Sequence, residues 1–330
     1  MNRSSKFLIF LIAGLIFFVM PAKGEELKKI AQTGMKWLSI PIGARASSLG
    51  GAFTALSNDA SSIFWNPAGL ALTRNGHAFL TQTQWIADIN VNAGVVSYNF
   101  PDIGVIGVSF SAVDWGDFHG TRRTAAGFEE TGAFSPTNWF VGLGYARSIS
   151  DRFSIGGHLK YLYEKLGTQL SGSMDNPEQY TAEMNLMAFD IGTIYYTGFR
   201  DLRFAMSLQN FSQERKYRVE HFPLPLTFKF GMAMNVTGLW IPESDHGITF
   251  AVDALHPRDY SERLHFGLEY SFKEMVFLRG GYKTNYDVED LTLGGGILYG
   301  VGGMAFALDY CYQTFKYFDD VHMFSFDFQF

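Results

Sequence analysis

Two groups of acidic and histidine residues have the side chains that water activation needs. An acid beside a histidine can act as a general base. The chain has no phosphate-binding P-loop, no His-Glu-x-x-His and no Gly-x-Ser-x-Gly motif, and surface loops commonly carry such residues. The two groups are Asp114, Asp117 and His119, and Asp253, His256 and Asp259. We therefore expect no catalytic residues and no enzyme activity.

Cysteine content and charge exclude other classes of site. Cys311 is the single cysteine, so neither an intramolecular disulfide framework nor a cysteine-based zinc cage can form. The net charge is −6, and loss of residues 1–24 would remove three cations and bring it to −9. An acidic chain is poorly suited to nucleic acid, because that binding neutralises phosphates. We expect no metal, no cofactor and no nucleic-acid partner.

Residues 1–24 have the pattern of a cleaved signal peptide. Arg3 and Lys6 precede an apolar run over residues 7–20, and Ala22 and Gly24 place small residues before a cut at Glu25. The run has 14 residues, whereas a spanning helix needs roughly 20. An uncleaved anchor is the alternative.

The rest of the chain alternates apolar and polar residues in fourteen segments, which is the period of β-strands. Most have 9 to 12 residues, close to the roughly 9–11 of a tilted membrane strand and longer than the roughly 5–6 of soluble strands. The segments are 75–85, 90–100, 104–113, 138–149, 153–165, 185–196, 202–210, 225–236, 247–255, 262–272, 275–284, 290–299, 303–313 and 321–330.

Alternation alone suits a soluble sandwich as well as a membrane barrel, whose apolar faces contact lipid. Three features favour the barrel: the even strand count, the loop lengths and the final strand, in which Phe326, Phe328 and Phe330 alternate with polar residues up to the terminus. We interpret these phenylalanines as a signal for the barrel-assembly machinery. The predicted fold class is all-β: a transmembrane antiparallel β-barrel of about 14 strands in the bacterial outer membrane, with lipid as its surroundings.

The connections alternate in length. If the last strand descends to the periplasm, short joins fall inside and long ones outside, as in outer-membrane barrels. The predicted long loops include 114–137, 166–184 and 211–224, and two joins oppose the trend: 237–246 is long and 86–89 is short. Both termini then lie in the periplasm, and the first strand must pair with the last, because a lipid-exposed sheet edge leaves backbone groups unpaired.

Much of the segment 25–72 does not alternate, and small residues dominate its stretch 43–70. Asn58 or Asp59 can cap a short helix through Phe64, and Pro67 should stop it. Since about eight strands already fill their own lumen, we expect residues 30–72 to fold inward as a plug within the barrel formed by 73–330. The alternative is an extension outside the barrel.

The plug segment carries a resemblance. Its Gly43-Ala-Arg45-Ala start, Leu49-Gly50-Gly51-Ala52, Asn58-Asp59-Ala60 and Asn66-Pro67-Ala68-Gly69-Leu70 resemble the amino-terminal signature of the PorV/PorQ family, relatives of the FadL fatty-acid transporters. Later pieces, 132–136 and 151–161, agree. The resemblance implies a fourteen-stranded FadL-like barrel. It also implies either a role in receiving cargo of type IX secretion or passage of hydrophobic molecules.

Charged residues on the predicted inner face mix both signs, whereas an ion-selective pore would favour one. We expect them to form a polar network in a wet lumen, with a dedicated permeation path as the alternative. Arg45 could anchor the plug to Asp190, Asp253 or Asp309. The other members of the network are Lys160, Arg203, Lys229, Arg263, Glu269 and Arg279, together with Glu164, His265 and Lys283.

Aromatic residues mark two further features. Rings at strand ends could form belts at headgroup depth, or reflect strand propensity: Trp139, Tyr195, Tyr196, Tyr270, Tyr299, Tyr310 and Tyr312. The loop 114–137 exposes Trp115, Phe118 and Phe128, which would suit a partner-binding surface or a lid over the mouth.

Three functions remain. The first is a docking component in protein export, whose partners are secretion-system proteins or exported cargo. The second is a transporter of hydrophobic small molecules, which predicts loss of uptake when the plug is locked at Leu49. The third and weakest is a hydrolase using His119 and His256.

Overall fold

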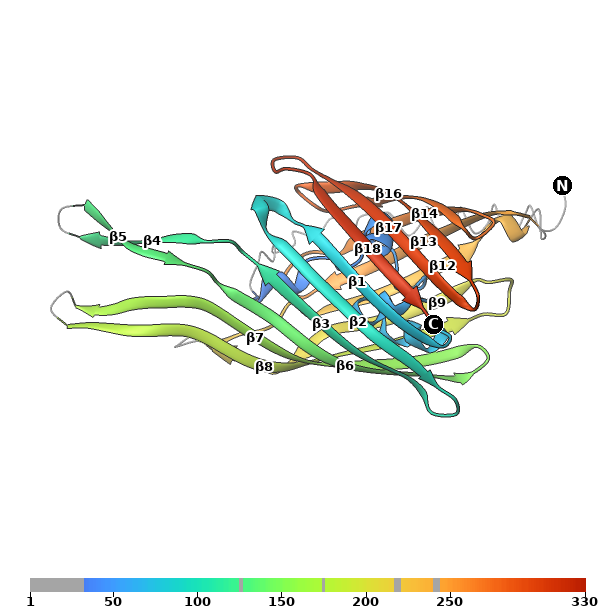
Figure 1. The fold of residues 1–330 in the computed structure, drawn as a ribbon, viewed down its shortest axis with the longest axis horizontal. Helices are drawn as coiled ribbons and strands as arrows, with labels where there is room; N and C mark the ends of the chain where they lie inside the picture. The colour runs from blue at the N-terminus through green and yellow to red at the C-terminus, as the bar shows by residue number, and fades with distance from the viewer. Residues whose placement is uncertain (1–32, 125–126, 174–175, 217–220, 240–243) are drawn as a thin grey trace.

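The computed structural model describes residues 33–124, 127–173, 176–216, 221–239 and 244–330. Fourteen antiparallel strands close into a barrel in the order β1-β18-β17-β16-β15-β14-β13-β12-β9-β8-β7-β6-β3-β2 (Figure 1). Their bounds are β1 Gly76–Gln84, β2 Asn90–Phe100, β3 Gly104–Asp114, β6 Thr137–Ser150, β7 Phe153–Ser173, β8 Asn176–Tyr196, β9 Arg203–Ser212, β12 Thr227–Asn235, β13 His246–Pro257, β14 Arg263–Phe272, β15 Val276–Lys283, β16 Glu289–Val301, β17 Met304–Phe315 and β18 Val321–Gln329. The predicted fold class is confirmed.

The barrel closes where the first strand meets the last. β1 pairs with β18 from His77 opposite Gln329 to Gln84 opposite His322. Gly76 and Phe330 exchange backbone hydrogen bonds of 2.8 and 2.9 Å. This pairing leaves no free edge for lipid to meet.

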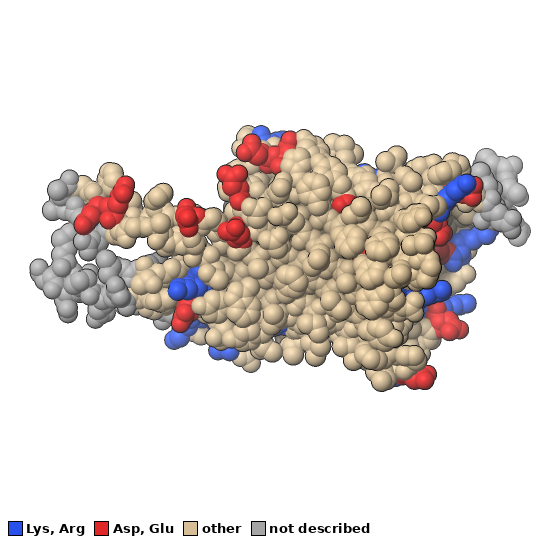
Figure 2. All heavy atoms as spheres, viewed as in Figure 1, with Lys and Arg blue, Asp and Glu red and all other residues tan. Residues whose placement is uncertain are grey.

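Side chains alternate between a lipid-facing and a lumen-facing surface. In β18, Phe324 is 48% exposed, whereas its neighbour Met323 is 0% exposed. On the face shown in Figure 2, charged residues gather toward the two ends, and the band between them is nearly all uncharged. This is the apolar band of a transmembrane barrel. No helix in the described part of the chain is long and apolar enough to cross a membrane.

Two predicted loops contain strands instead. The segment 166–184 continues β7 and β8, each of 21 residues. The segment 114–137 holds a separate hairpin of β4 (Phe118–Thr124) and β5 (Gly127–Phe134). Both ribbons extend well past the barrel in Figure 1. Outside the membrane their polar residues carry no hydrophobic alternation, so the pattern that located the other strands is missing there.

The two ends of the barrel differ. We call the end carrying β4 and β5 the long-loop end and the opposite end the short-turn end. The long-loop end also carries β10 (Arg215–Lys216) and β11 (His221–Phe222). Both predicted exceptions are present: the β12–β13 connection at the short-turn end is long and contains η5 (Thr237–Leu239), and η4 (Ile86–Asp88) forms a short join at the long-loop end.

The amino-terminal segment crosses the lumen. Gly34 N–H donates to the carbonyl of Pro223 at the long-loop end, while Asn99 N–H donates to the carbonyl of Asn75 at the short-turn end. Phe330 therefore lies at the end opposite to the first described residue, Thr33. The predicted periplasmic position of the amino terminus, and the signal peptide, lie outside the described residues.

Four short helical elements make up this segment: η1 Lys36–Ser39, α2 Ala44–Ser48, η2 Ala60–Phe64 and η3 Pro67–Leu72. α2 contacts β15 to β18, η2 contacts β1 and β2, and η3 contacts β3, β6, β7 and β8. The remaining four strands reach it through Ser207 of β9, Gly231 of β12, Asp253 of β13 and Gly267 of β14. A segment touched by all fourteen strands lies inside the barrel, and we name residues 33–73 the plug.

The caps of η2 and η3 follow the sequence, with one correction. Asp59 caps η2 in a capping box with Ser62. Pro67 does not stop that helix, which already ends at Phe64. Instead, Pro67 is the first residue of the next helix, η3. A proline needs no N–H there, and Asn66 supplies the cap by accepting a hydrogen bond from Ala68 N–H.

The plug approaches the wall more closely than side chains would permit. Gly50 has φ +67°, and a Cβ at Gly281 would lie 2.0 Å from Gly50 N. Only glycine at both positions allows this contact. Around it Leu49, Phe53 and Leu56 are 0 to 1% exposed, and each such burial is worth roughly 1.5–3 kcal/mol.

Candidate functional site

Wall side chains hold the plug through its backbone. Asp253 Oδ2 accepts hydrogen bonds from Phe53 N–H at 3.1 Å and Thr54 N–H at 2.9 Å. Ser325 Oγ accepts from Ala44 N–H at 2.8 Å, and Thr292 Oγ1 accepts from Gly50 N–H at 2.9 Å. Because these bonds fix main-chain groups, they position the plug whatever its side chains are.

A buried ion network joins the plug to the barrel at Arg45. Arg45 Nη1 lies 2.7 Å from Asp59 of the plug, and its Nε lies 3.4 Å from Glu269 of β14. The predicted anchors were Asp190, Asp253 and Asp309; the orientation of α2 turns Arg45 to Glu269 instead. The carboxylates of Asp59 and Glu269 together compensate the charge of the partly buried guanidinium.

The same network continues along the wall. Arg279 Nε donates to Glu269 at 2.7 Å, and its Nη1 donates to Asp309 at 2.5 Å. The Arg279 side chain is 2% exposed. One guanidinium on β15 thus bridges a carboxylate on the adjacent strand β14 and another on β17, two strands away, using the several N–H donors that arginine carries.

On the opposite wall lies a second network. Lys160 Nζ is 2.8 Å from Asp190 Oδ2, and His158 Nδ1 is 3.3 Å from the same oxygen. His158 Nε2 lies 2.8 Å from Ser109 Oγ. Strand register alone brings Ser109, His158 and Asp190 together, so no local motif could reveal them. They resemble a catalytic triad. His158 and Ser109 are only 0 and 1% exposed, however, and the ring of Phe64 packs against His158, so the group is closed to a substrate.

The remaining predicted network residues pack against aromatic rings. Arg263 lies 4.3 Å from the ring centre of Tyr260 and 3.9 Å from that of Tyr286. Lys229 Nζ lies 4.7 Å from the ring centre of Trp65. Such contacts stabilise a cation by about 0.5–2 kcal/mol. Arg203 lies 5.6 Å from the ring centre of Tyr196. Burial raises the pKa of Tyr286 in the β15–β16 connection.

The lumen has a strongly apolar region at the long-loop end, and a smaller one nearer the short-turn end, where Phe79, Val95 and Val105 pack against the plug. Six wall residues that point inward at the long-loop end are 8% exposed or less: Val91, Val113, Phe140, Leu162, Met184 and Leu186. We name them the inner apolar patch. Met35 and Trp37 of the plug cover it, with Trp37 stacked on Phe140 at 6.2 Å between ring centres. Polar and charged side chains face most of the lumen elsewhere.

Sequence reasoning missed this patch, although a signal exists. Phe140 lies opposite Leu162, and Leu162 lies opposite Leu186. Each is within an uninterrupted apolar run, 139–141, 161–163 and 186–189. A strand that is apolar on both faces is buried on both faces. Three such runs in register mark an apolar inner surface.

The predicted partner-binding loop is only partly exposed. Trp115 is half-buried, and its Nε1 donates to Asn138 Oδ1 at 2.7 Å, so it fastens the base of the hairpin to the wall. Phe118 stacks on Phe134 at 5.8 Å, whereas Phe128 is 78% exposed. The hairpin projects away from the barrel and does not form the predicted lid (Figure 1).

Most of the predicted aromatic belt faces outward: Tyr195, Tyr299 and Tyr310 are 46, 58 and 38% exposed. Tyr196 differs, because the next residue in a strand points to the other face. It packs beside the plug core instead. In the final strand, Phe326 and Phe330 are 37 and 45% exposed on the lipid face, and Phe328 stacks on Phe306.

The two acid–histidine groups do not assemble into a site. Asp253 is bound by the plug backbone, Asp259 by Lys36 at 2.6 Å, and His256 faces Glu262 at 2.9 Å. Asp117 accepts a hydrogen bond from Ser135. Among the described residues, no cluster of histidine, cysteine and acidic side chains could hold a metal ion.

The closed fourteen-stranded wall with a segment through its lumen defines a plugged transmembrane β-barrel. The chain belongs to the family described as "Uncharacterised protein family (UPF0164)", whose model matches residues 16–203. No curated protein matches the chain.

Similar solved structures share this fold. A structure titled "CymD monoaromatic hydrocarbon channel" has a TM-score of 0.58 at 12% identity and covers 88% of this chain and 98% of its own. The Pseudomonas putida toluene transporter TodX has a TM-score of 0.57 at 10% identity and covers 87% and 96%. A Pseudomonas aeruginosa FadL homologue has a TM-score of 0.53 at 10% identity and covers 88% and 98%. At these identities the likeness establishes the fold.

Proposed function

We propose that this protein is an outer-membrane transporter that admits hydrophobic small molecules at its long-loop end, which faces the cell exterior. The observation that carries the proposal is the inner apolar patch. An apolar surface at the long-loop mouth of the lumen needs an apolar occupant, and in the present state Met35 and Trp37 of the plug occupy it. A hydrophobic ligand would take their place. The structural relatives titled as a hydrocarbon channel and a toluene transporter support this class of substrate.

The plug is less firmly held at this end than in the middle of the lumen. Trp37 Nε1 is buried without a hydrogen-bond partner in the described residues, and a buried unsatisfied donor costs about 1–3 kcal/mol. Lys36, bonded to Asp259, is 39% exposed, and exposed ion pairs contribute about 1 kcal/mol or less. The η1 end of the plug is therefore the part that a ligand displaces first. Because α2, η2 and η3 fill the lumen beyond it, the middle of the plug must also move before the ligand can pass.

A reversible disulfide between plug and wall tests the proposal. A Cβ built at Gly267 lies 3.3 Å from Ala52 Cβ and 2.8 Å from Leu49 O, so the plug must shift slightly to admit the new side chain, which also moves the pair toward the ~3.8 Å of natural disulfides. We expect Ala52→Cys with Gly267→Cys, in a Cys311→Ala background, to lose uptake of labelled toluene by at least about ten-fold when oxidised, because a covalent bond outlasts any plug motion. Dithiothreitol should restore uptake.

The matched control cross-links wall to wall. A Cβ at Gly107 lies 3.4 Å from Ser97 Cβ, and these residues are paired on β3 and β2. Ser97→Cys with Gly107→Cys should oxidise equally well and leave uptake unchanged. If the oxidised plug–wall variant transports as fast as this control, the plug does not move during transport and the proposal fails.

Docking in protein export remains a second candidate because of one observation: the two ribbons that project from the long-loop end (Figure 1). A photo-reactive amino acid at Phe128 should then form a discrete adduct with a secretion-system or cargo protein in cells. The control position is Tyr317, which is also 78% exposed and lies at the same end. Identical adduct patterns at the two positions would contradict docking at this hairpin.

A further inference from the structure

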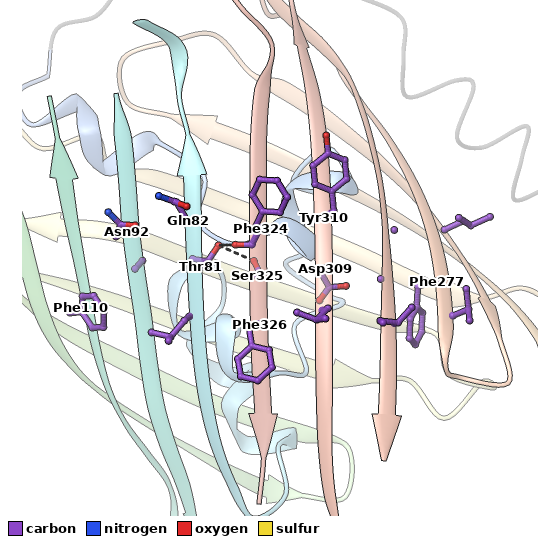
Figure 3. A pocket seen from close by; sticks show the side chains of 18 residues that line it. Thr81, Gln82, Asn92, Phe110, Phe277, Asp309, Tyr310, Phe324, Ser325 and Phe326 are labelled. Carbon is purple, nitrogen blue, oxygen red and sulfur yellow. Dashed lines mark hydrogen bonds between the residues drawn. The ribbon is translucent and has the colours of Figure 1, made fainter. Parts of the chain in front are cut away.

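A long groove of about 830 Å³ crosses the outer, lipid-facing surface of the wall (Figure 3). Its floor is the backbone of residues whose side chains turn inward, such as Thr81, whose hydroxyl meets Ser325 Oγ at 2.8 Å. The groove is therefore separate from the lumen. Unbroken strand pairing lies between the two along its length.

Two rows of outward side chains form its sides. Register pairs link the members of each row from strand to strand. One row is Val276, Ile297, Leu308, Phe326, Leu80 and Phe110, and the other is Leu278, Gly295, Tyr310, Phe324, Gln82 and Asn92. Gly295 interrupts the second row and widens the groove there, whereas the side chains of Leu80 and Phe110 close over Gly94 in the first row.

The shape of the groove selects an extended occupant. Its width is the gap between two adjacent rows of outward side chains. It runs across seven neighbouring strands, β15-β16-β17-β18-β1-β2-β3. Six inter-strand spacings of about 4.8 Å give a length of roughly 29 Å. A compact molecule would leave most of this length empty, and a second barrel could not enter so narrow a space. A single extended hydrocarbon chain fits both dimensions.

The lining identifies the chemistry of the rest of the ligand. The only charged residue that lines the groove is Asp309, and it turns inward to Arg279. The outward polar groups gather at the long-loop side, where Gln82 and Asn92 are exposed partners on β1 and β2. Nearby, Tyr310 and His322 are bonded at 2.8 Å. Side-chain amides donate and accept without charge, which matches the ester, amide and hydroxyl groups at the head of an acyl chain and not its phosphate.

We infer that this groove binds one acyl chain of a membrane lipid, with the carbonyl or hydroxyl groups at the head of that chain against Gln82 and Asn92. The chain lies along the register rows and fills the gap at Gly295. The protein thereby holds a specific lipid on one side of the barrel, in addition to the mobile lipid around its whole circumference.

Photolabelling tests the inference. The probe is phosphatidylethanolamine with a diazirine in one acyl chain, present in vesicles of phosphatidylethanolamine and phosphatidylglycerol that contain the full-length processed chain. We expect label on peptides of β15–β18 and β1–β3 to exceed label on the opposite strands β9 and β12 by about ten-fold, the ratio given by about 1.4 kcal/mol of preference.

Two matched variants locate the site. In Gly295→Leu the new side chain enters the groove, and its Cβ meets only Phe277 O at 3.2 Å and Leu278 Cδ2 at 3.9 Å. Gly280→Leu adds the same group on the adjacent strand beside Leu293. Gly295→Leu should abolish the excess label and Gly280→Leu should preserve it, with heat-modifiable electrophoretic mobility confirming that both fold. Even labelling around the barrel, protection of the groove within a dimer, or equal loss in both variants would overturn the inference.

Discussion

Replacing Arg279 with leucine is expected to destabilise the barrel by about 3–5 kcal/mol, the effect of removing one partner from a buried ion pair. Arg279 is 2% exposed and neutralises Glu269 and Asp309 together. Leucine fills similar space but leaves two carboxylates of β14 and β17 without their shared cation. The measurement is urea unfolding of the protein in lipid vesicles, followed by tryptophan fluorescence and extrapolated to water.

A neutral triple variant separates charge from packing. In Glu269→Gln, Arg279→Leu, Asp309→Asn the carboxylates are removed with their cation, so most of the lost stability should return. The recovery will be incomplete, because Arg45 also contacts Glu269 at 3.4 Å. If the triple variant is no more stable than Arg279→Leu, uncompensated charge is not the cause, and the buried network contributes through packing alone.

The lipid-facing pattern of the barrel could be predicted because the membrane imposes it. In β7 and β12, alternate residues must be apolar wherever they meet acyl chains, and Phe228 and Phe230 on β12 are 42 and 38% exposed accordingly. Strand number and closure follow, since no strand edge can remain unpaired in lipid. The same argument explains where prediction failed: β7 continues to Ser173 beyond the membrane, where alternation is no longer required.

The partners of lumen residues could not be predicted from the sequence. Alternation places Lys160 and Arg279 on the inner face, yet which carboxylate each one meets depends on strand register. Arg45 shows this most clearly, because Asp309 and Glu269 were equally available by pattern, and only the placement of α2 brings Arg45 to Glu269. Ser109 and His158 met for the same reason.

The inner apolar patch is an intermediate case. Its runs of consecutive apolar residues, such as 161–163, are visible in the sequence, but a search for alternation treats Leu162 as an exception. What makes the runs significant is that Phe140, Leu162 and Leu186 come into register and are covered by Trp37. Local pattern therefore reveals that a strand is apolar on both faces, and only topology shows what the inner face contacts.

Substituting Asp253 with alanine is expected to release the middle of the plug. The carboxylate accepts hydrogen bonds from Phe53 N–H and Thr54 N–H, and Asp253 is 0% exposed. Each buried N–H left without an acceptor costs about 1–3 kcal/mol. Since about 1.4 kcal/mol changes a population ten-fold, the open-plug state should increase at least about ten-fold. Amide hydrogen exchange of residues 50–57 and single-channel conductance in planar bilayers measure it.

Asp253→Asn is the matched control. Asparagine keeps a side-chain oxygen that can accept both N–H groups but removes the charge near Lys229, which the alanine variant also removes. If hydrogen bonding holds the plug, asparagine should behave nearly as the native residue, and alanine should raise both exchange and conductance. Equal effects of the two substitutions would assign the hold to charge, and no effect of either would mean that the plug is held elsewhere, at Ser325 and Thr292. Release at Asp253 with toluene uptake unchanged would place the permeation path outside the plugged lumen.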